Sequence, residues 1–171
     1  IMELTIIKHT DNNYAYTNLV FVSPLDFETL KKQGPDPASE GQILVQFLGG
    51  QANSAFGPSK HIYAAAADSK VKDGELALSG QQRDDVYVAL GVKVEVRGYN
   101  VRGAPSDRIT LSVDLRQPPK DNETPLELDC AKLEKSFTKN FSGQMFRLGQ
   151  KVLVKQKKTL VLEVTNIEYA D

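Results

Sequence analysis

The side chains that could carry chemistry in this chain are few and widely spaced. Asp84 and Asp85 form an adjacent carboxylate pair directly after Arg83. Paired carboxylates can share general acid and base work, but neighbouring residues on a strand or turn point apart, which disfavours a shared reaction here. His9 lies two residues before Asp11, a spacing more typical of a turn than of a catalytic pair. These residues do not indicate a catalytic site.

Phosphate and metal motifs are absent from the sequence as well. Neither GxxxxGK[ST] nor GxSxG occurs, and Gly49-Gly50 has no lysine at the spacing of a phosphate loop. His9 and His61 are far apart and have no Cys or His partners at metal-ligand spacing. The single cysteine, Cys130, falls on the apolar side of a predicted helix, where we expect a core residue rather than a reactive thiol. We expect no metal and no cofactor here, and a non-catalytic interaction domain.

Composition and charge narrow the classes of partner. The chain has 171 residues and a net charge of −1, with 40% hydrophobic and 25% charged residues, which is ordinary for a globular protein. The balanced charge and the lack of tryptophan disfavour a nucleic-acid platform. No apolar run approaches the ~20 residues that span a bilayer. The lone cysteine makes a reducing compartment the default. The chain opens on Ile1 without a signal peptide, so we expect a piece of a longer protein.

The strongest periodic signal in the first half is the alternation in Lys93–Arg97, which predicts a half-buried strand. The branched run Glu75–Leu78 predicts another strand. The polar stretch between them, Ser79–Asp85, is expected to be a link on the surface. Arg83 would then present its guanidinium on a connection between two core strands. A solvated arginine and a binding contact are both compatible with that position.

Short strands recur through the rest of residues 1–100. A short helix is expected at Phe27–Lys31 and a loop at Gln33–Gly41, whereas the Gly- and Ser-rich stretch Gly49–Ser59 is expected to be mobile. Many short strands separated by turn signals are typical of an all-β barrel or sandwich. The further predicted strands are Met2–Lys8, Asn18–Ser23, Ile43–Leu48 and His61–Ala66.

The second half has a different character. Tyr99–Asp107 holds turn formers and no periodicity, so we place a boundary there between a subdomain of residues 1–100 and one of residues 101–171. Arg108–Leu115 alternates and predicts a strand. Lys151–Lys155 and Thr159–Thr165 predict a hairpin. This half is expected to be α+β.

A helix is predicted between these strands. Thr124 can act as its cap, Pro125 suits the first helical position, and Glu127 completes a capping box. Gly143 is placed to end or follow the helix. Its apolar face would be formed, at helical spacing, by Leu126, Cys130, Leu133, Phe137 and Phe141.

Several blocks of the sequence resemble the amino-terminal domain of the N-ethylmaleimide-sensitive fusion ATPase (NSF) family. The stretch VKDGELALSGQQRDDVYVALGVKVEV is similar to the end of the first subdomain of that domain. Phe141–Asp171 resembles the family's Q-x-F-x-x-G-Q pattern, followed by a hairpin and an I-E-x-x-D ending. Tyr16–Leu19 with Ser23–Phe27 is similar to the family's first turn. The blocks keep the family's order over nearly the whole chain, while Lys31–Lys70 matches poorly and is expected to carry insertions.

The resemblance implies a fold and a role. The fold would be mostly β with α+β, a double-psi β-barrel subdomain followed by a smaller α+β subdomain. Six such domains crown a hexameric AAA+ ATPase and grip the SNAP adaptor on a SNARE complex, which the ATPase then disassembles during vesicle fusion and protein transport. ATP and Mg would bind only in ATPase domains outside this chain. The family's domain runs past the position of Asp171, so the terminal strands of the second subdomain are expected to be missing.

The resemblance also implies binding residues for the acidic part of SNAP. Arg83 matches the arginine after Gln-Gln, and Lys8 matches the basic residue before the first turn. Arg116 and Lys120 are the nearest substitutes for the family's paired lysines. Several such contacts would be salt-sensitive and reversible. The chain itself would be a cytoplasmic monomer without nucleic-acid partners, reaching membranes peripherally through SNAP–SNARE complexes.

Two alternatives differ in client or class. Related AAA+ ATPases use similar amino-terminal domains to bind ubiquitin-linked cofactors or membrane lipids, and SNAP binding would separate the two readings. Double-psi barrels also house enzymes, which would require a pocket with converging carboxylates or a bound cofactor.

Overall fold

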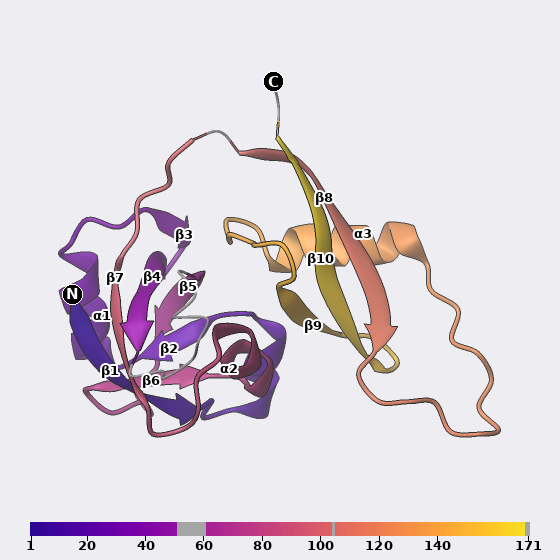
Figure 1. Ribbon diagram of the computed structural model, residues 1–171, viewed down its shortest axis with the longest axis horizontal. Coiled ribbons are helices and arrows are strands. Elements are labelled where there is room, and N and C mark those ends of the chain that lie inside the picture. The colour runs from indigo at the N-terminus through magenta and orange to yellow at the C-terminus, as the bar shows by residue number, and fades with distance from the viewer. Residues whose placement is uncertain (51–60, 104, 170–171) are drawn as a thin grey trace.

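The computed structural model describes residues 1–50, 61–103 and 105–169 (Figure 1). Two bodies of strands are visible, one at each end of the segment after β7 (Lys93–Gly98). Nearly all of the loop predicted at Gly49–Ser59 lies outside the described residues. The division of the chain at residue 100 into two domains stays a prediction.

The first body is a closed β-barrel. Pairing between β4 and β7 joins the two sides of one sheet, so its strands form a cylinder, with β3 added outside. Two of the pairings, β1 with β6 and β2 with β5, are parallel. The predicted fold class, mostly β with a double-psi-type barrel before an α+β part, is confirmed, and of barrel and sandwich the structure shows the barrel. The sheet order is β3 (Pro37–Ser39), β4 (Gln42–Gly50), β5 (Ile62–Ala67), β2 (Val20–Val22), β6 (Glu75–Leu78), β1 (Met2–Lys8) and β7.

Alternation fills the barrel interior. In β7, Val94 and Val96 are buried while Lys93 and Glu95 are exposed, as the sequence pattern predicts. Burying such branched side chains contributes about 1.5–3 kcal/mol each to stability. The main interior cluster also takes side chains from β1, β2, β4, β5, β6 and two helices. The interior is therefore filled by side chains, and the ends and outer surface of the barrel are left for contacts.

The prediction of a surface link at Ser79–Asp85 is wrong. These residues form α2 (Gly80–Val86), and both Gln81 and Gln82 are buried. The Ser79 hydroxyl accepts the Gln82 N–H at 3.1 Å, and the Gln82 side chain accepts the Ser79 N–H at 2.9 Å. The Ser-x-x-Gln pattern of this capping box is present in the sequence, but the polar composition of the stretch favoured the prediction of a surface link.

Two short helices and one strand refine the remaining predictions for the barrel. The helix α1 spans Pro24–Lys31, three residues longer at its start than expected, because Ser23 caps it and Pro24 suits the first turn. A 3-10 helix, η1 (Asn12–Tyr16), is capped by Asp11. The loop predicted at Gln33–Gly41 contains the short strand β3.

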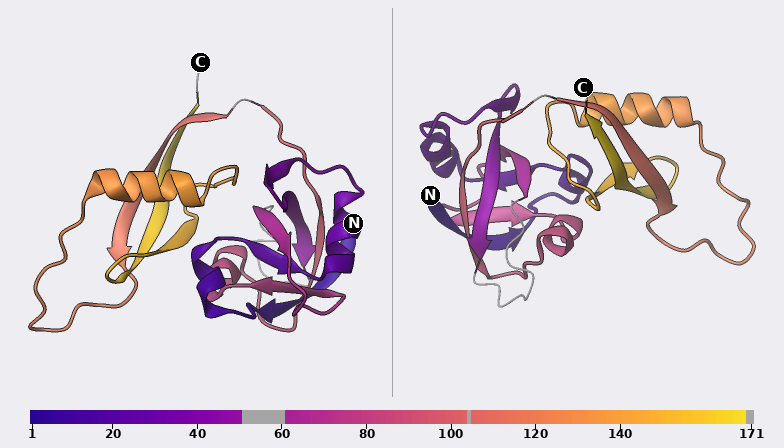
Figure 2. Two further views of the ribbon diagram at one scale, coloured as in Figure 1. Left: turned by 180° about the vertical axis from the view of Figure 1, so that it is seen from behind. Right: turned by 45° about the horizontal axis from the view of Figure 1, so that its top comes forward.

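The second body is a three-stranded antiparallel sheet with one helix on it. Its order is β8 (Ser106–Leu115), β10 (Thr159–Tyr169), β9 (Lys151–Lys155). The predicted strand at 108–115 and the predicted hairpin are confirmed. The helix α3 (Cys130–Asn140) packs on one face of the sheet (Figure 2). Its apolar side chains join those of the strands in a separate cluster.

Two expectations about this helix are wrong. It begins after Asp129, whose carboxylate accepts the N–H groups of Ala131 and Lys132 at 3.1 and 3.2 Å, rather than at Thr124. The helix starts at the aspartate cap, which lies closer to the apolar residues, and the predicted capping box at Thr124 does not form its start. Cys130 is exposed and lines the open groove between α3 and β8, so it is not a core residue.

Polar contacts and one close approach join the two bodies. The Gln144 amide donates to the Thr17 carbonyl and accepts from Asn18, both at 2.9 Å. Gly143 follows α3 at φ +78, and a Cβ built there would overlap the carbonyl oxygen of Ala38 in β3. A side chain at position 143 would therefore push the two bodies apart.

We expect Gly143→Ala to destabilise the protein by more than Gly149→Ala, its matched control. Both glycines have a positive φ, which costs an L-residue about 1–2 kcal/mol. Gly149 has open space around its Cβ position, so only Gly143→Ala adds the overlap with Ala38. Urea unfolding of both variants measures the difference. Equal losses would show that the junction is not tightly packed at Ala38.

Candidate functional site

A groove of about 540 Å³ lies where α2 faces the second sheet. One wall carries Gln81, Asp84 and Asp85 of α2, followed by Tyr87 at its C-terminal end. The capping box of Ser79 and Gln82 fixes the start of α2 and so the position of these side chains. The other wall is formed by His61, Arg116, Glu163 and the turn of residues 147–151.

The charges of this groove differ in how accessible they are. Arg116, Arg147 and Lys151 are exposed, whereas Asp85 and Glu163 are half-buried. The Asp85 carboxylate accepts the Lys151 backbone N–H and the Gln81 amide, both at 3.1 Å. Burial raises the pKa of Asp85 above its ordinary value, against these hydrogen bonds. Cations therefore outnumber anions among the exposed charges.

Gln150 fixes the turn that carries Arg147. Its side chain is buried and accepts the Arg147 N–H at 3.1 Å, while its own N–H donates to the Arg147 carbonyl at the same distance. Within the described residues the Gln150 Nε2 has no hydrogen-bond partner. Arg147 Nη1 lies 3.4 Å from His61 Nδ1, so one wall of the groove meets the start of β5. Arg147 is thus held at its backbone by Gln150 and at its guanidinium by His61.

Two of the predicted binding residues come together elsewhere, at one end of the barrel. Lys8 is the exposed last residue of β1 and lies beside Leu78 of β6 in the parallel register. Arg83 is half-buried, and its Nη1 donates to the Leu78 carbonyl at 3.0 Å. Arg83 is thus anchored on a helix and does not extend from a surface loop, which corrects the predicted setting of this residue.

His9 lies next to this pair. Its Nε2 is 3.2 Å from the Leu19 carbonyl, which also accepts the Gln82 amide at 3.2 Å. Its ring meets those of Tyr14 and Phe21 edge-on. Burial lowers the pKa of His9 from 6.5 to about 4, and the positive charge of Arg83 contributes in the same direction. His9 is therefore neutral near pH 7 and belongs to the packing of the barrel end.

The other two predicted residues are not brought together. Arg116 follows β8 and lines the groove beside α2. Lys120 lies in a different hollow, with Glu123 and Lys158, which pair with each other. The predicted set therefore occupies three places: the barrel end, the groove and this hollow. None of these placements tests a binding role.

Arg147 and Lys151 were not among the predicted residues. Both flank the Gly149-Gln150 part of the Q-x-F-x-x-G-Q pattern, where a turn enters β9. Charged residues beside a turn glycine are a signal of exposure that could have pointed to them. Their position opposite α2 depends on how the sheet docks on the barrel and had no signal in the sequence.

The structure is thus mostly β, with a barrel, a small α+β body and, between them, a groove that exposes three cations and one anion. No family model matches the chain. The chain is 23% identical over 175 aligned positions to the vesicular-fusion protein SEC18 of Candida albicans, with 99% of this chain covered. It is 24% identical over 151 positions to a vesicle-fusing ATPase of Arabidopsis thaliana, with 88% covered. The similarity to NSF-type proteins thus extends over most of the chain.

The chain spans about a fifth of the length of these relatives, 19% and 18%. In the described parts of the chain, no helix has the length and apolar character that a membrane crossing requires. Among the same residues, His, Cys, Asp and Glu side chains do not gather in groups of three or more that could hold a metal ion.

We expect the free energy of unfolding to fall as the pH drops from about 6.5 to about 4, in part because of His9. The unfolded chain takes up a proton near pH 6.5, whereas folded His9 resists protonation until about pH 4. The contribution of neutral His9 to the free energy of unfolding is fully present above this window, and a loss on the order of 3 kcal/mol accumulates across it. Urea unfolding of wild type and His9→Gln at several pH values measures this loss. Parallel pH profiles would contradict it.

Proposed function

We propose that this chain is the adaptor-binding amino-terminal domain of an NSF-type AAA+ ATPase. In this role it binds SNAP on SNARE complexes, and the ATPase domains, which hold ATP and Mg, lie outside it. It acts without catalysis of its own, in the cytoplasm and at membranes through SNAP. The observation that carries the proposal is the similarity to two vesicle-fusion proteins over 99% and 88% of the chain.

The architecture supports a binding role. The barrel interior is filled by side chains, so partners must bind at the surface, where Lys8, Arg116, Arg147 and Lys151 are exposed. Arginine forks onto carboxylates, so an acidic adaptor segment suits such a surface. The proposed contacts are Lys8 and Arg83 at the barrel end and Arg116 in the groove, with Lys120 as an outlying member.

Arg83 is compatible with this role although it is anchored. A guanidinium has five N–H donors, and the Leu78 carbonyl takes one of them. An arginine held in this way loses less side-chain entropy when it binds a carboxylate. Removing it also removes the bond to Leu78, so Arg83 variants need a stability control, whereas Lys8 and Arg116 are exposed and provide cleaner tests.

Charge reversal of the exposed contacts should weaken SNAP binding. Lys8→Glu and Arg116→Glu are each expected to lower the affinity for SNAP on a SNARE bundle by roughly threefold to tenfold, or about 0.7–1.4 kcal/mol. The loss should shrink as salt rises, because exposed charges are screened. Titration by calorimetry at low and moderate salt measures this, with Arg83→Gln beside them and circular dichroism as the fold check. Lys132→Glu, an exposed lysine on α3, is the matched control.

The outcomes separate the readings. Salt-sensitive binding that Lys132→Glu leaves intact and Lys8→Glu or Arg116→Glu weakens supports both the function and the residues. If SNAP binds equally well to all of these variants, the proposed function stands, but the binding site lies at other residues. Absence of SNAP binding even when several copies are displayed together, where avidity multiplies weak contacts, would overturn the proposal. Binding of ubiquitin-linked cofactors or lipid vesicles in its place would favour the alternative client.

A further inference from the structure

The second sheet has one edge strand that faces away from the barrel. In the order β8-β10-β9, β9 packs against α2 and η1 at one side, and β8 forms the other side (Figure 1). The strand β8 has 10 residues and no proline, carries the charged residues Asp107, Arg108 and Asp114, and pairs on one side with β10. A long edge strand leaves a row of unpaired backbone groups, which is a template for pairing with another chain where its charges find partners.

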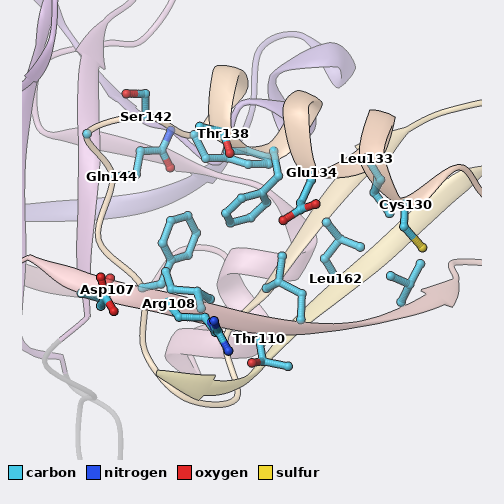
Figure 3. A pocket seen from close by; sticks show the side chains of 18 residues that line it. Asp107, Arg108, Thr110, Cys130, Leu133, Glu134, Thr138, Ser142, Gln144 and Leu162 are labelled. Atoms are coloured by element: carbon cyan, nitrogen blue, oxygen red, sulfur yellow. The ribbon is translucent and has the colours of Figure 1, made fainter. Parts of the chain in front are cut away.

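A groove of about 900 Å³ with a mixed polar and apolar lining runs between this strand and α3 (Figure 3). Its floor includes Leu133 and Phe137 of α3 and Leu162 of β10. On the β8 side Ile109 is half-buried and Val113 is 40% exposed. The apolar face of β8 is therefore only partly covered by its own helix.

The backbone groups of β8 alternate between its two sides. The Arg116 N–H donates to the Thr159 carbonyl at 2.9 Å, and the Thr110 carbonyl accepts the Thr165 hydroxyl at 3.2 Å. Even-numbered residues thus turn toward β10, and the odd-numbered residues that lie between them turn their N–H and C=O groups to the outer edge. The Leu115 N–H, on that outer side, donates to the Asp114 carboxylate at 2.8 Å.

We propose that a second copy of this chain adds to this edge, so that two β8 strands pair antiparallel about a two-fold axis at Leu111. Such a pair joins the two sheets into one and places the two α3 helices on the same face. Ile109 of each copy lies opposite Val113 of the other, as a hydrogen-bonded pair. The two grooves meet along this seam, and the half-covered apolar side chains cover one another.

Charge selects this register among its neighbours. With the axis at Leu111, Arg108 lies directly across from Asp114 of the second copy, twice in the dimer. Moving the axis to Thr110 sets Arg108 against Ser112, and moving it to Ser112 sets Arg108 against Arg116. Directly opposed unlike charges stabilise an antiparallel pair, and like charges destabilise it. Arg108 already lies 3.9 Å from Glu168 on β10, so it would bridge two carboxylates.

The proposal replaces the monomer expected from the sequence, because a strand's place at a sheet edge is visible only in the fold. It is independent of the adaptor-binding role. Lys8 and Arg83 lie on the barrel, away from β8, so their part in SNAP binding can be measured separately from self-association, whereas Arg116 directly follows β8.

Sedimentation velocity of the 171-residue chain over a range of concentrations tests the association. We expect a reversible dimer of twice the chain mass, and we expect Val113→Lys to make the protein monomeric with unchanged circular dichroism. Leu148→Lys is the matched control, since Leu148 is an exposed leucine outside β8, and it should dimerise like wild type. A monomer at every concentration, or a dimer that survives Val113→Lys, would overturn the proposal.

Cross-linking tests the register itself. The axis at Leu111 places Thr110 of one copy beside Ser112 of the other as a non-hydrogen-bonded pair, whose side chains are close enough for a disulfide. In a Cys130→Ser background, a mixture of Thr110→Cys and Ser112→Cys chains should form a covalent dimer under mild oxidation. Either variant alone should form several-fold less. Equal cross-linking in the mixture and in the separate variants would overturn this register.

Discussion

Pairing of strand edges is the constraint on which this structure depends. A strand in water leaves a row of backbone donors and acceptors that must find partners. In the barrel the β4–β7 pairing meets this demand by joining the first and last long strands of the sheet. The same closure fixes where each strand ends. The end of β1 and the end of β6 lie side by side, which brings Lys8 next to the carbonyl that anchors Arg83.

The second sheet meets the same demand only in part. Its β9 edge is sheltered because it packs beside α2 and η1, where the Lys151 N–H finds the Asp85 carboxylate. That contact also sets the groove in which Arg116, Arg147 and Lys151 are exposed. The docking of one sheet edge on the barrel therefore creates the candidate binding surface. The opposite edge, β8, remains the place where a further strand can add.

Local patterns were sufficient for the elements but not for their partners. The alternation in β7, in β8 and in the two strands of the hairpin predicted strands that are present. Polarity misled at α2, because Gln81 and Gln82 are polar yet buried through side-chain hydrogen bonds. Cys130 fitted the helical spacing, but the spacing cannot show that a groove between α3 and β8 leaves this side chain exposed. The candidate site is the part that the sequence predicts least, because Arg147 faces α2 only through contacts between residues far apart in sequence.

The barrel end with Lys8 and Arg83 and the groove beside α2 differ in rigidity, and this difference affects how a partner would bind to them. Arg83 and Lys8 lie beside a neutral, half-buried histidine and a packed aromatic cluster, so that surface is rigid. The groove instead lies between two bodies joined by Gln144, Asp85 and a few other polar contacts. Any shift of one body relative to the other changes the spacing of Arg116 from α2, while the distance from Lys8 to Arg83 stays fixed within the barrel. An acidic partner that engages both surfaces would therefore also restrain the junction between the two bodies.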